Sequence, residues 1–216
     1  MYPIERVLID LVIDSDVTGF KLNSNEVLGI YAYGSAMYKT INERSDYDFV
    51  VIIDMQADYL QYETSKLDIH FISPMYYKKL LKEHDIMALE CFFNTNPILK
   101  YDTEFELDLC SLRKKISAIC NNSWVKASKK LNLVEEDDYT GLKSLFHSFR
   151  ILSFGIDLAK DNKINFEYID NKPAIEWWYE IQKLYNSGYK WEEFKNHFKE
   201  KHNALASEFR KLAPKE

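Results

Sequence analysis

Asp46 and Asp48 stand one residue apart, at the start of an apolar run that continues to Ile53. Side chains at positions i and i+2 of a strand point to the same face of a sheet, so we expect the two carboxylates to converge. Neighbouring carboxylates repel each other unless a cation neutralises them, and hard oxygen ligands suit Mg²⁺. The pair therefore predicts a magnesium site.

A glycine-serine step precedes this pair. The apolar run over 27–33 ends at Gly34-Ser35, nine residues follow, and Ser45 then leads into Asp46. Glycine lets a backbone approach a ligand closely, and N–H groups at the start of a following helix can receive phosphate oxygens. A phosphate site beside a metal site predicts nucleoside triphosphate chemistry.

A third acidic residue lies on the run KLDIHFI, residues 66–72, which alternates between two faces. Its apolar face carries Leu67, Ile69 and Phe71, and the other face carries Asp68 and His70. The alternation predicts a strand. Asp68 is then either a further site carboxylate or an ordinary solvated residue. His70 either approaches the site or is a packed, hydrogen-bonded neighbour.

The stretch from Val27 to Ile53 resembles the signature of the DNA polymerase beta-type nucleotidyltransferase superfamily, a glycine-serine step followed by Asp-x-Asp between two strands. The resemblance implies an enzyme that moves a nucleoside monophosphate from an NTP, such as ATP, to an acceptor hydroxyl and releases pyrophosphate. It also implies two Mg²⁺ ions, with Mn²⁺ as a substitute. Asp46 and Asp48 would ligate both ions, and Asp68 would hold one and help to deprotonate the acceptor.

In the same comparison, Gly34 and Ser35 would grip the β- and γ-phosphates and Ser45 would orient the carboxylates. The acceptor stays open between an RNA or tRNA 3′ end, a protein hydroxyl and a small molecule. An alternative from another class is a non-catalytic NTP-binding or partner-binding module, antitoxin-like or regulatory, on the same fold. Loss of a carboxylate would mark such a module, and the three aspartates are intact.

Composition fits an ordinary soluble globular protein, with 46% hydrophobic and 29% charged residues. The formal charge of −6 argues against a general nucleic-acid binder. Residues 1–110 hold 9 Lys and Arg against 19 Asp and Glu, and residues 111–216 hold 19 against 15. The acidic half contains the expected metal site. The basic half either faces an anionic substrate or is a solvated surface.

The sequence also indicates in which cellular compartment we expect the protein. No apolar run approaches the roughly 20 residues that span a bilayer, and the N-terminus MYPIERVLID lacks the features of a signal peptide. We therefore expect a cytoplasmic protein with no membrane partner. Three cysteines without a C-x-x-C spacing argue against a disulfide framework and a zinc site. The oligomeric state is left open.

The hydrophobic pattern predicts an α+β fold, a small mixed sheet flanked by helices and followed by an all-helical C-terminal domain. We place a catalytic domain at 1–108 and a helical domain at 109–216. Strands are expected over 27–33, from 45 to 53 and over 66–72, a short strand at 21–22, and a strand or short helix over 59–64. Helices are expected over 4–13, 74–83 and from Asp85, which would cap it.

The helical domain is expected to contain helices over 109–120, 123–131, 140–161, 173–186 and 191–212. Large aromatic residues recur in its last two helices at near-helical spacing: Trp177, Trp178, Tyr185, Trp191, Phe194 and Phe198. Such residues dominate core burial, so we interpret them as core and not as a base-stacking platform.

The resemblance extends over most of the chain, to predicted nucleotidyltransferases of bacteria and phages that join a minimal catalytic domain to a helical tail. The segments 85–101 and 143–157 are similar to that subgroup. Lys143, His147 and Arg150 share one face of the expected helix. This face is either a solvated polar stripe or lines the cleft between the domains, in which case Lys143 would reach the triphosphate and Arg150 would hold a phosphate or an acidic residue of the first domain. Where that subgroup has glycine, four residues after Ser35, this chain has Lys39, an additional cation near the expected phosphates.

Overall fold

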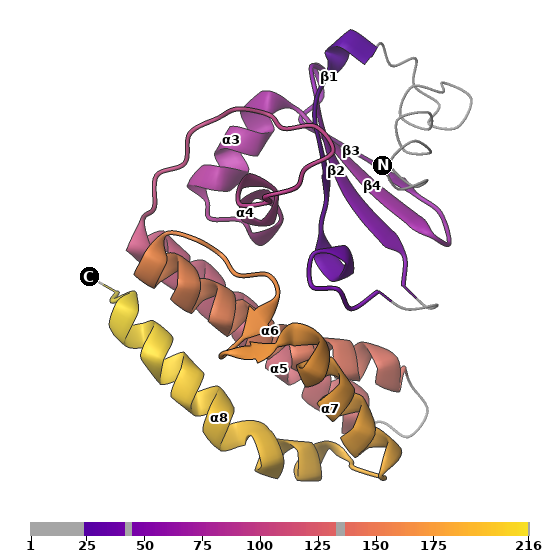
Figure 1. Cartoon of the computed structure of the whole chain (residues 1–216), viewed down its shortest axis with the longest axis vertical. Helices are drawn as coiled ribbons and strands as arrows, with labels where there is room; N and C mark the ends of the chain where they lie inside the picture. Colours follow the sequence, from indigo (N-terminus) through magenta and orange to yellow (C-terminus); the bar gives the residue numbers. More distant parts are fainter. Residues whose placement is uncertain (1–23, 42–44, 133–136, 216) are drawn as a thin grey trace. The chain divides into compact units, whose positions relative to one another are not determined.

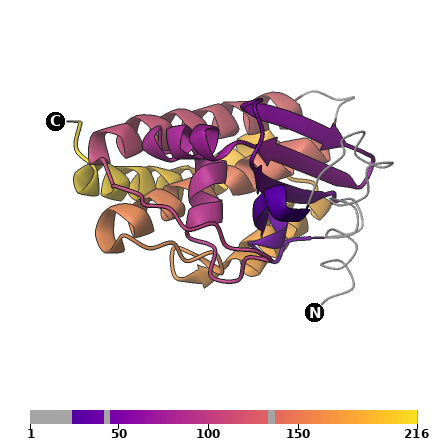
Figure 2. The same ribbon diagram turned by 90° about the horizontal axis from the view of Figure 1, so that it is seen from above.

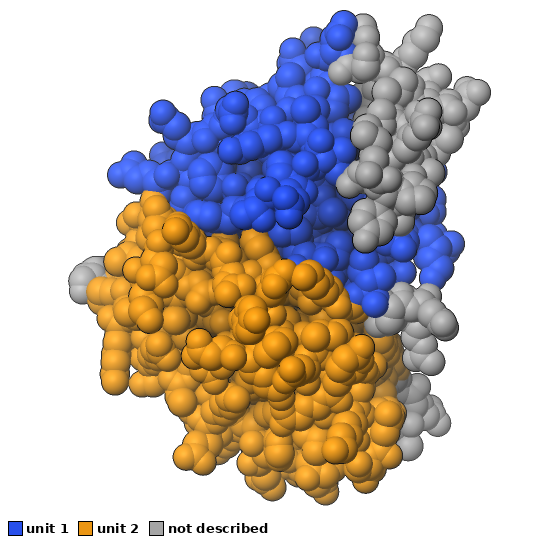
Figure 3. All heavy atoms as spheres, in the orientation of Figure 1, with its two compact units in different colours: residues 1–37, 41–106 blue, residues 38–40, 107–216 orange. Residues whose placement is uncertain are grey.

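The computed structural model describes residues 24–41, 45–132 and 137–215. The chain divides into two compact units, shown in different colours in Figure 3. The first unit comprises residues 1–37 and 41–106, and the second comprises residues 38–40 and 107–216. The expected helix over 4–13 and the expected strand at 21–22 lie outside the described residues.

The first unit is built on a four-stranded mixed sheet of order β1-β2-β4-β3 (Figures 1 and 2). The strands are β1 (Val27–Ala32), β2 (Tyr47–Ile53), β3 (Tyr59–Glu63) and β4 (Leu67–Ile72). β2 and β4 are parallel, and the other two pairings are antiparallel. The segment over 59–64, left open between strand and helix, is a strand, and the predicted α+β class is confirmed.

β2 is buried on both faces. Phe49, Val51 and Ile53 pack with Ile69 of β4 and Ile30 of β1 in one core cluster. The alternate residues of β2 are also enclosed, with both Val50 and Ile52 at 0% exposure. A continuous apolar run is typical of a strand covered on two sides. The strand that carries Asp48 is therefore the most enclosed element of the first unit's sheet.

Two short helices follow β4, α3 (Pro74–Lys82) and α4 (Ile86–Phe92). Both predicted starts are confirmed. Pro74 occupies the first turn of α3, and the Ser73 hydroxyl before it accepts a hydrogen bond from Tyr76 N at 3.1 Å. The Asp85 carboxylate accepts from Met87 N at 3.1 Å, so it caps α4.

α3 lies over the face of the sheet to which Tyr31 and Val50 point. These two residues are partners across β1 and β2, so their side chains share a face. Tyr101 N donates to the Tyr31 hydroxyl at 2.7 Å, and the Tyr101 ring meets the ring of Tyr77 in α3. Figure 1 shows α3 and α4 on one side of this sheet.

The second unit contains four helices and a small hairpin among its described residues. The helices are α5 (Leu109–Asn132), α6 (Asp138–Asp161), α7 (Ala174–Asn186) and α8 (Trp191–Leu212). The hairpin pairs β5 (Tyr168–Ile169) with β6 (Lys172–Pro173). None of the described helices has the length and apolar character needed to cross a membrane.

The expected division of α5 into two helices is wrong, because the helix runs unbroken through Asn121 and Asn122. Asparagine lowers helix propensity by well under about 1 kcal/mol per residue, less than glycine and far less than proline. The buried side chains continue on both sides of the step, with Ile116 and Cys120 before it and Ala127 after it. Packing of this apolar face outweighs the weak local preference.

The aromatic residues of the second unit form its core, as predicted. Trp177, Trp178, Trp191, Phe194 and Phe198 are all buried. Tyr185, the sixth of the expected group, is only partly buried. Its hydroxyl donates to the carboxylate of Asp138 at the start of α6. The interpretation as a base-stacking platform has no support in the burial of these rings.

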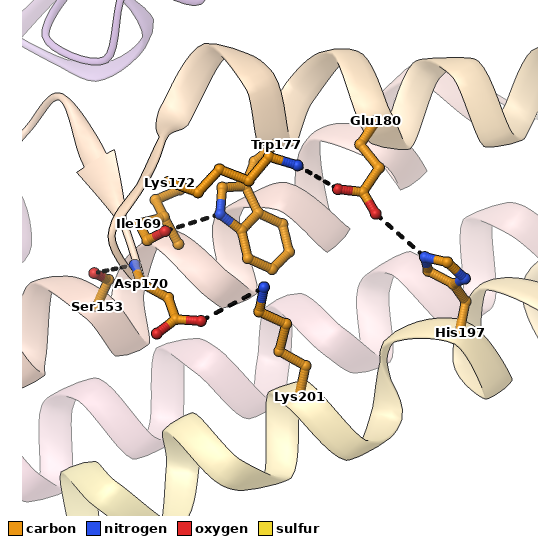
Figure 4. A network of polar contacts seen from close by, with 8 residues as sticks. All are labelled: Ser153, Ile169, Asp170, Lys172, Trp177, Glu180, His197 and Lys201. Atoms are coloured by element: carbon orange, nitrogen blue, oxygen red, sulfur yellow. Dashed lines mark hydrogen bonds and ion pairs between the residues drawn. The ribbon is translucent and has the colours of Figure 1, made fainter.

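A polar network ties the hairpin β5–β6 to α6, α7 and α8 (Figure 4). The Trp177 indole N–H donates to Ile169 O at 2.9 Å, and Asp170 N donates to the Ser153 hydroxyl at 3.3 Å. Lys201 of α8 lies 3.5 Å from the Asp170 carboxylate and 4.3 Å above the centre of the Trp177 ring. The network therefore closes over a buried tryptophan.

Glu180 of α7 extends this network (Figure 4). Its carboxylate accepts a hydrogen bond from the Lys172 ammonium and lies 3.2 Å from His197 Nε2. Burial raises the pKa of Glu180, but hydrogen bonds from Lys172 and His197 and their positive charges outweigh it and hold the pKa below its ordinary value. The carboxylate links the hairpin to α8.

Candidate functional site

Asp48 and Asp68 lie side by side at the starts of β2 and β4. The two strands are parallel, and Asp48 and Asp68 are direct partners in the register. Partnered residues of neighbouring strands point to the same face, so both carboxylates lie on the face that also carries Tyr31. Asp46 immediately precedes β2, two residues before Asp48, and is partly buried. The structure thus brings two of the three expected carboxylates together on adjacent strands, with the third at the strand entrance.

Gly34 closes this arrangement from the end of β1. Tyr33 N donates to Asp48 O at 3.0 Å, which holds the end of β1 beside the start of β2. A β-carbon built on Gly34 would stand only 2.5 Å from Asp48 Oδ2, and Gly34 has φ +63°. Any other residue would meet both a strained backbone and a collision with the carboxylate. Glycine at this position therefore lets the turn lie against Asp48.

The helix that follows β1 at Gly34-Ser35 is short. The turn forms only η2 (Gly34–Ala36), a single 3₁₀ turn in which Met37 N donates to Gly34 O at 3.1 Å. The N–H of Gly34 donates to Glu90 Oε2 at 3.2 Å. The contact between Gly34 N–H and phosphate stays a prediction, since the structure gives this N–H a protein acceptor.

Glu90 is the residue of this site that the sequence reasoning missed. It lies in α4 and is 1% exposed. A nearly fully buried carboxylate is rare unless it is paired or hydrogen-bonded. The signal in the sequence was its place as the one charged residue in the otherwise apolar segment IMALECF, residues 86–92. That pattern marks a buried acid but does not say what it contacts.

Asp68 is held by neighbours on the sheet. Gln61 Nε2 donates to Asp68 Oδ1 at 2.8 Å, and His70 Nε2 lies 3.3 Å from Asp68 Oδ2. The other ring nitrogen of His70 lies 2.7 Å from the Tyr59 hydroxyl. His70 is thus the hydrogen-bonded neighbour of Asp68, one of the two interpretations left open. Each carboxylate oxygen has two lone pairs, so these contacts still allow Asp68 to bind a cation.

The pKa of Tyr33 reflects the negative charge on this face of the sheet. Its ring meets the His70 ring at 5.7 Å between centres. Burial raises the pKa of the Tyr33 phenol, and the negative charges of Asp48, Asp68 and Glu90 raise it further. Because several carboxylates act on one phenol, this part of the sheet carries negative potential, which favours a cation there.

The donor set fits Mg²⁺ in its chemistry, since carboxylate oxygens are the ligands that this ion prefers. Among the described residues, however, no three His, Cys, Asp or Glu side chains are gathered closely enough to hold a metal ion as they stand. Metal binding by Asp46, Asp48 and Asp68 therefore requires their side chains to turn. Ser45, buried directly before Asp46, keeps its predicted role of orienting the pair. Both roles stay predictions.

The three polar residues expected on one helical face lie on α6 of the second unit. Lys143 is exposed, with its ammonium 5.4 Å from the centre of the Tyr139 ring. The surrounding protein and the charge of Arg150 lower the pKa of His147 well below its ordinary value, so the ring is neutral at pH 7. The Arg150 guanidinium stacks 3.9 Å from the centre of the Tyr38 ring. Lys143 is the exposed cation of the three, and its contact with nucleotide stays a prediction.

Lys39 occupies the position at which the similar subgroup has glycine. Its φ is +54°, in the left-handed region that glycine enters most readily. Glycine is therefore the easy residue at this turn, and lysine adopts the same conformation at a cost. The Lys39 ammonium forms an ion pair with Glu167, and both residues belong to the second unit. It is engaged there, and the structure gives no support to a role at phosphates.

Comparison with known proteins shows what this chain is similar to. The family model described as "Polymerase beta, Nucleotidyltransferase" matches residues 20–120. A nucleotidyltransferase-like protein from Exiguobacterium sibiricum 255-15 is similar at 13% identity with a TM-score of 0.32, over 97% of this chain and 74% of that one. The comparison with curated proteins finds no match. The matched region contains the Gly34-Ser35 turn, the Asp46 and Asp48 pair and Asp68, so this part of the chain is similar to the polymerase beta-type nucleotidyltransferase superfamily.

Proposed function

We propose that the first unit transfers a nucleoside monophosphate from an NTP to an acceptor hydroxyl, with release of pyrophosphate, in a metal-dependent reaction. One observation carries the proposal: the Gly34 turn lies directly against the Asp48 carboxylate, whose strand partner is Asp68. The turn to which we assign the phosphates therefore lies beside a pair of hard oxygen ligands.

In this proposal Asp46, Asp48 and Asp68 would hold Mg²⁺. When bound, the ion would neutralise phosphate charge and lower the pKa of the acceptor hydroxyl. Asp68 would take the proton of that hydroxyl, and His70 with Gln61 would hold its carboxylate in position, as partners of metal-binding carboxylates commonly do. The acceptor oxygen forms a bond to the α-phosphorus, and the bond from the α-phosphorus to the oxygen bridging to the β-phosphate breaks.

The phosphates are assigned to two parts of the chain. The Ser35 hydroxyl donates to the β- or γ-phosphate, and the absence of a side chain at Gly34 keeps the turn against Asp48. Lys143 would add a point charge toward the triphosphate from an exposed position on α6. The negative field of the carboxylates opposes binding of a bare triphosphate. We therefore propose that nucleotide binds as its magnesium complex.

The acceptor is sought directly. The purified chain is incubated with each NTP labelled at the α-phosphate, with Mg²⁺ or Mn²⁺, and with total RNA, lysate protein or a small-molecule extract. The expected result is label in one acceptor class with the parent and none with Asp48→Asn. Nucleotide binding without any labelled product would favour the non-catalytic module. Equal labelling by Asp48→Asn would contradict the proposed site.

A further inference from the structure

Glu90 connects α4 to the end of β1. Its carboxylate is 1% exposed and accepts the N–H of Gly34 at 3.2 Å. A charged group placed so far from water is destabilising unless hydrogen bonds compensate for its lost hydration. The N–H of Gly34 is one such bond, and a bond between a charged acceptor and a backbone donor is among the stronger kinds.

The position of this carboxylate is electrostatically unfavourable on its own. Asp48 Oδ2 lies against the α-carbon of Gly34, so Asp48 and Glu90 flank the same glycine from two elements. Burial raises the pKa of the Tyr33 phenol, and the negative charges of Asp48, Asp68 and Glu90 raise it further. Like charges on two carboxylates beside the same residue repel each other. A neutral apolar residue at position 90 would avoid this repulsion but would not accept a hydrogen bond from the N–H of Gly34.

α4 and the residues after it hold the turn at two points. Glu90 binds Gly34 N, and the Asn94 side chain donates to Ala32 O at 3.3 Å and lies 3.4 Å from Met37 Sδ. Glu90 and Asn94 thus bind the backbone at Gly34 and Ala32, and Asn94 also contacts the side chain of Met37. The helix itself begins at a residue fixed by the Asp85 cap.

We propose that Glu90 is a positioning residue of the transfer reaction, which fixes the Gly34-Ser35 turn by holding the N–H of Gly34 both before and after nucleotide binds. The inference rests on the proposed function for its consequence in catalysis. It assigns the phosphate contact of this turn to Ser35, because the N–H of Gly34 is committed to the protein. Displacement of Glu90 by phosphate would leave a buried carboxylate without this bond.

The first test measures the turn and not the reaction. Hydrogen exchange of the Gly34 amide is followed by NMR in the ¹⁵N-labelled full chain for the parent, Glu90→Gln and Glu90→Ala. Glu90→Ala removes the acceptor, so the amide should exchange about tenfold faster or more, the range expected for losing a bond to a charged group. Glu90→Gln keeps a side-chain oxygen that can accept, so its amide should stay close to the parent's. Unchanged protection in Glu90→Ala would overturn the proposal.

The second test asks whether Glu90 keeps its bond to the N–H of Gly34 when nucleotide binds, or whether phosphate replaces Glu90. The same exchange is measured with a non-hydrolysable Mg²⁺–NTP analogue. Glu90→Ala should keep a fast Gly34 amide in the presence of the analogue, because the proposal gives that amide no phosphate partner. Restored protection, or tighter binding of the analogue by Glu90→Ala than by the parent, would mean that phosphate replaces Glu90 and would overturn it.

The kinetic test uses Glu83→Ala as a control, since Glu83 caps the end of α3 and is exposed. Glu90→Ala should raise the NTP Michaelis constant about tenfold, by the same estimate, and Glu90→Gln should restore most of the loss. Glu90→Gln as inactive as Asp48→Asn would show that the charge itself is needed, which contradicts a positioning role. Thermal unfolding of each variant identifies a folding defect. Faster exchange of the Gly34 amide in Glu90→Ala, combined with no transfer by the parent, would reject the proposed function and leave the Glu90 contact established.

Discussion

Gly34 leaves no room for a side chain beside Asp48, since a β-carbon there would stand 2.5 Å from the Asp48 carboxylate oxygen. The two halves of the sequence signature are therefore in contact. The turn after β1 and the acid at the start of β2 form one surface, and a change in either alters the other.

Gly34→Ala should abolish transfer with only a modest loss of stability. The substitution adds the strain of a positive φ, roughly 1 to 2 kcal/mol, and displaces the Asp48 carboxylate. Gly188→Ala is a matched control, because Gly188 has φ +92° but a β-carbon added there would meet nothing within 4 Å. Transfer rates and urea unfolding are measured for both. Full activity in Gly34→Ala would show that the contact with Asp48 is not required.

Asp68→Asn should slow transfer and leave NTP binding largely intact, because the proposed loss lies in deprotonation of the acceptor. The asparagine oxygen can still accept from Gln61, so the local packing is preserved. Single-turnover rates and nucleotide titrations on the same samples separate the two effects. A normal single-turnover rate would make Asp68 an ordinary strand residue held by His70.

Lys143→Ala should weaken binding of Mg²⁺–NTP, and the deficit should shrink as salt rises, because added ions screen the lost attraction. Lys160→Ala is the control, an exposed lysine in the last turn of the same helix. Affinity is measured by calorimetry at low and high salt. Parent-like affinity of Lys143→Ala at low salt would show that this lysine does not contact nucleotide.

Stability should fall as pH drops from about 6.5 toward 4, in part because of His202. Burial, with a smaller effect from Arg210, lowers the pKa of His202 to about 4, and its Nε2 lies 3.3 Å from Cys120 Sγ. Below pH 6.5 the unfolded chain binds a proton that the folded state refuses, so up to about 3 kcal/mol is lost across this window. His202→Gln should flatten the decline in urea unfolding. An equally steep decline would assign it to His147 or other groups.

The sequence predicted the parts of the fold whose signals are local. The alternation of β4, the Asp85 cap and both ends of α8 each depend on residues within a few positions of the feature. The register that places Asp48 opposite Asp68 was not predicted in detail, but each aspartate was assigned to the correct strand. Pattern is informative wherever one face of an element is buried.

The rest depended on contacts between distant residues. Glu90 reaches Gly34 across 56 positions of the chain, and a lone acid in an apolar helix does not reveal its partner. The positive φ of Gly34 and the bond from its N–H to Glu90 are likewise features of the turn that its local sequence does not reveal. Asn121 and Asn122 gave a break in the pattern that packing of α5 overrides.

Metal-dependent transfer at the Asp46 and Asp48 pair is tested most directly by release of pyrophosphate coupled to labelling of the acceptor, measured for the parent, Asp46→Asn and Asp48→Asn at increasing Mg²⁺. We predict Mg²⁺-dependent turnover by the parent and none by either variant. Both variants should unfold at or above the parent's temperature, since each removes a charge from a crowded acidic face. Turnover by both variants equal to the parent's, at the same Mg²⁺ dependence, would contradict the account.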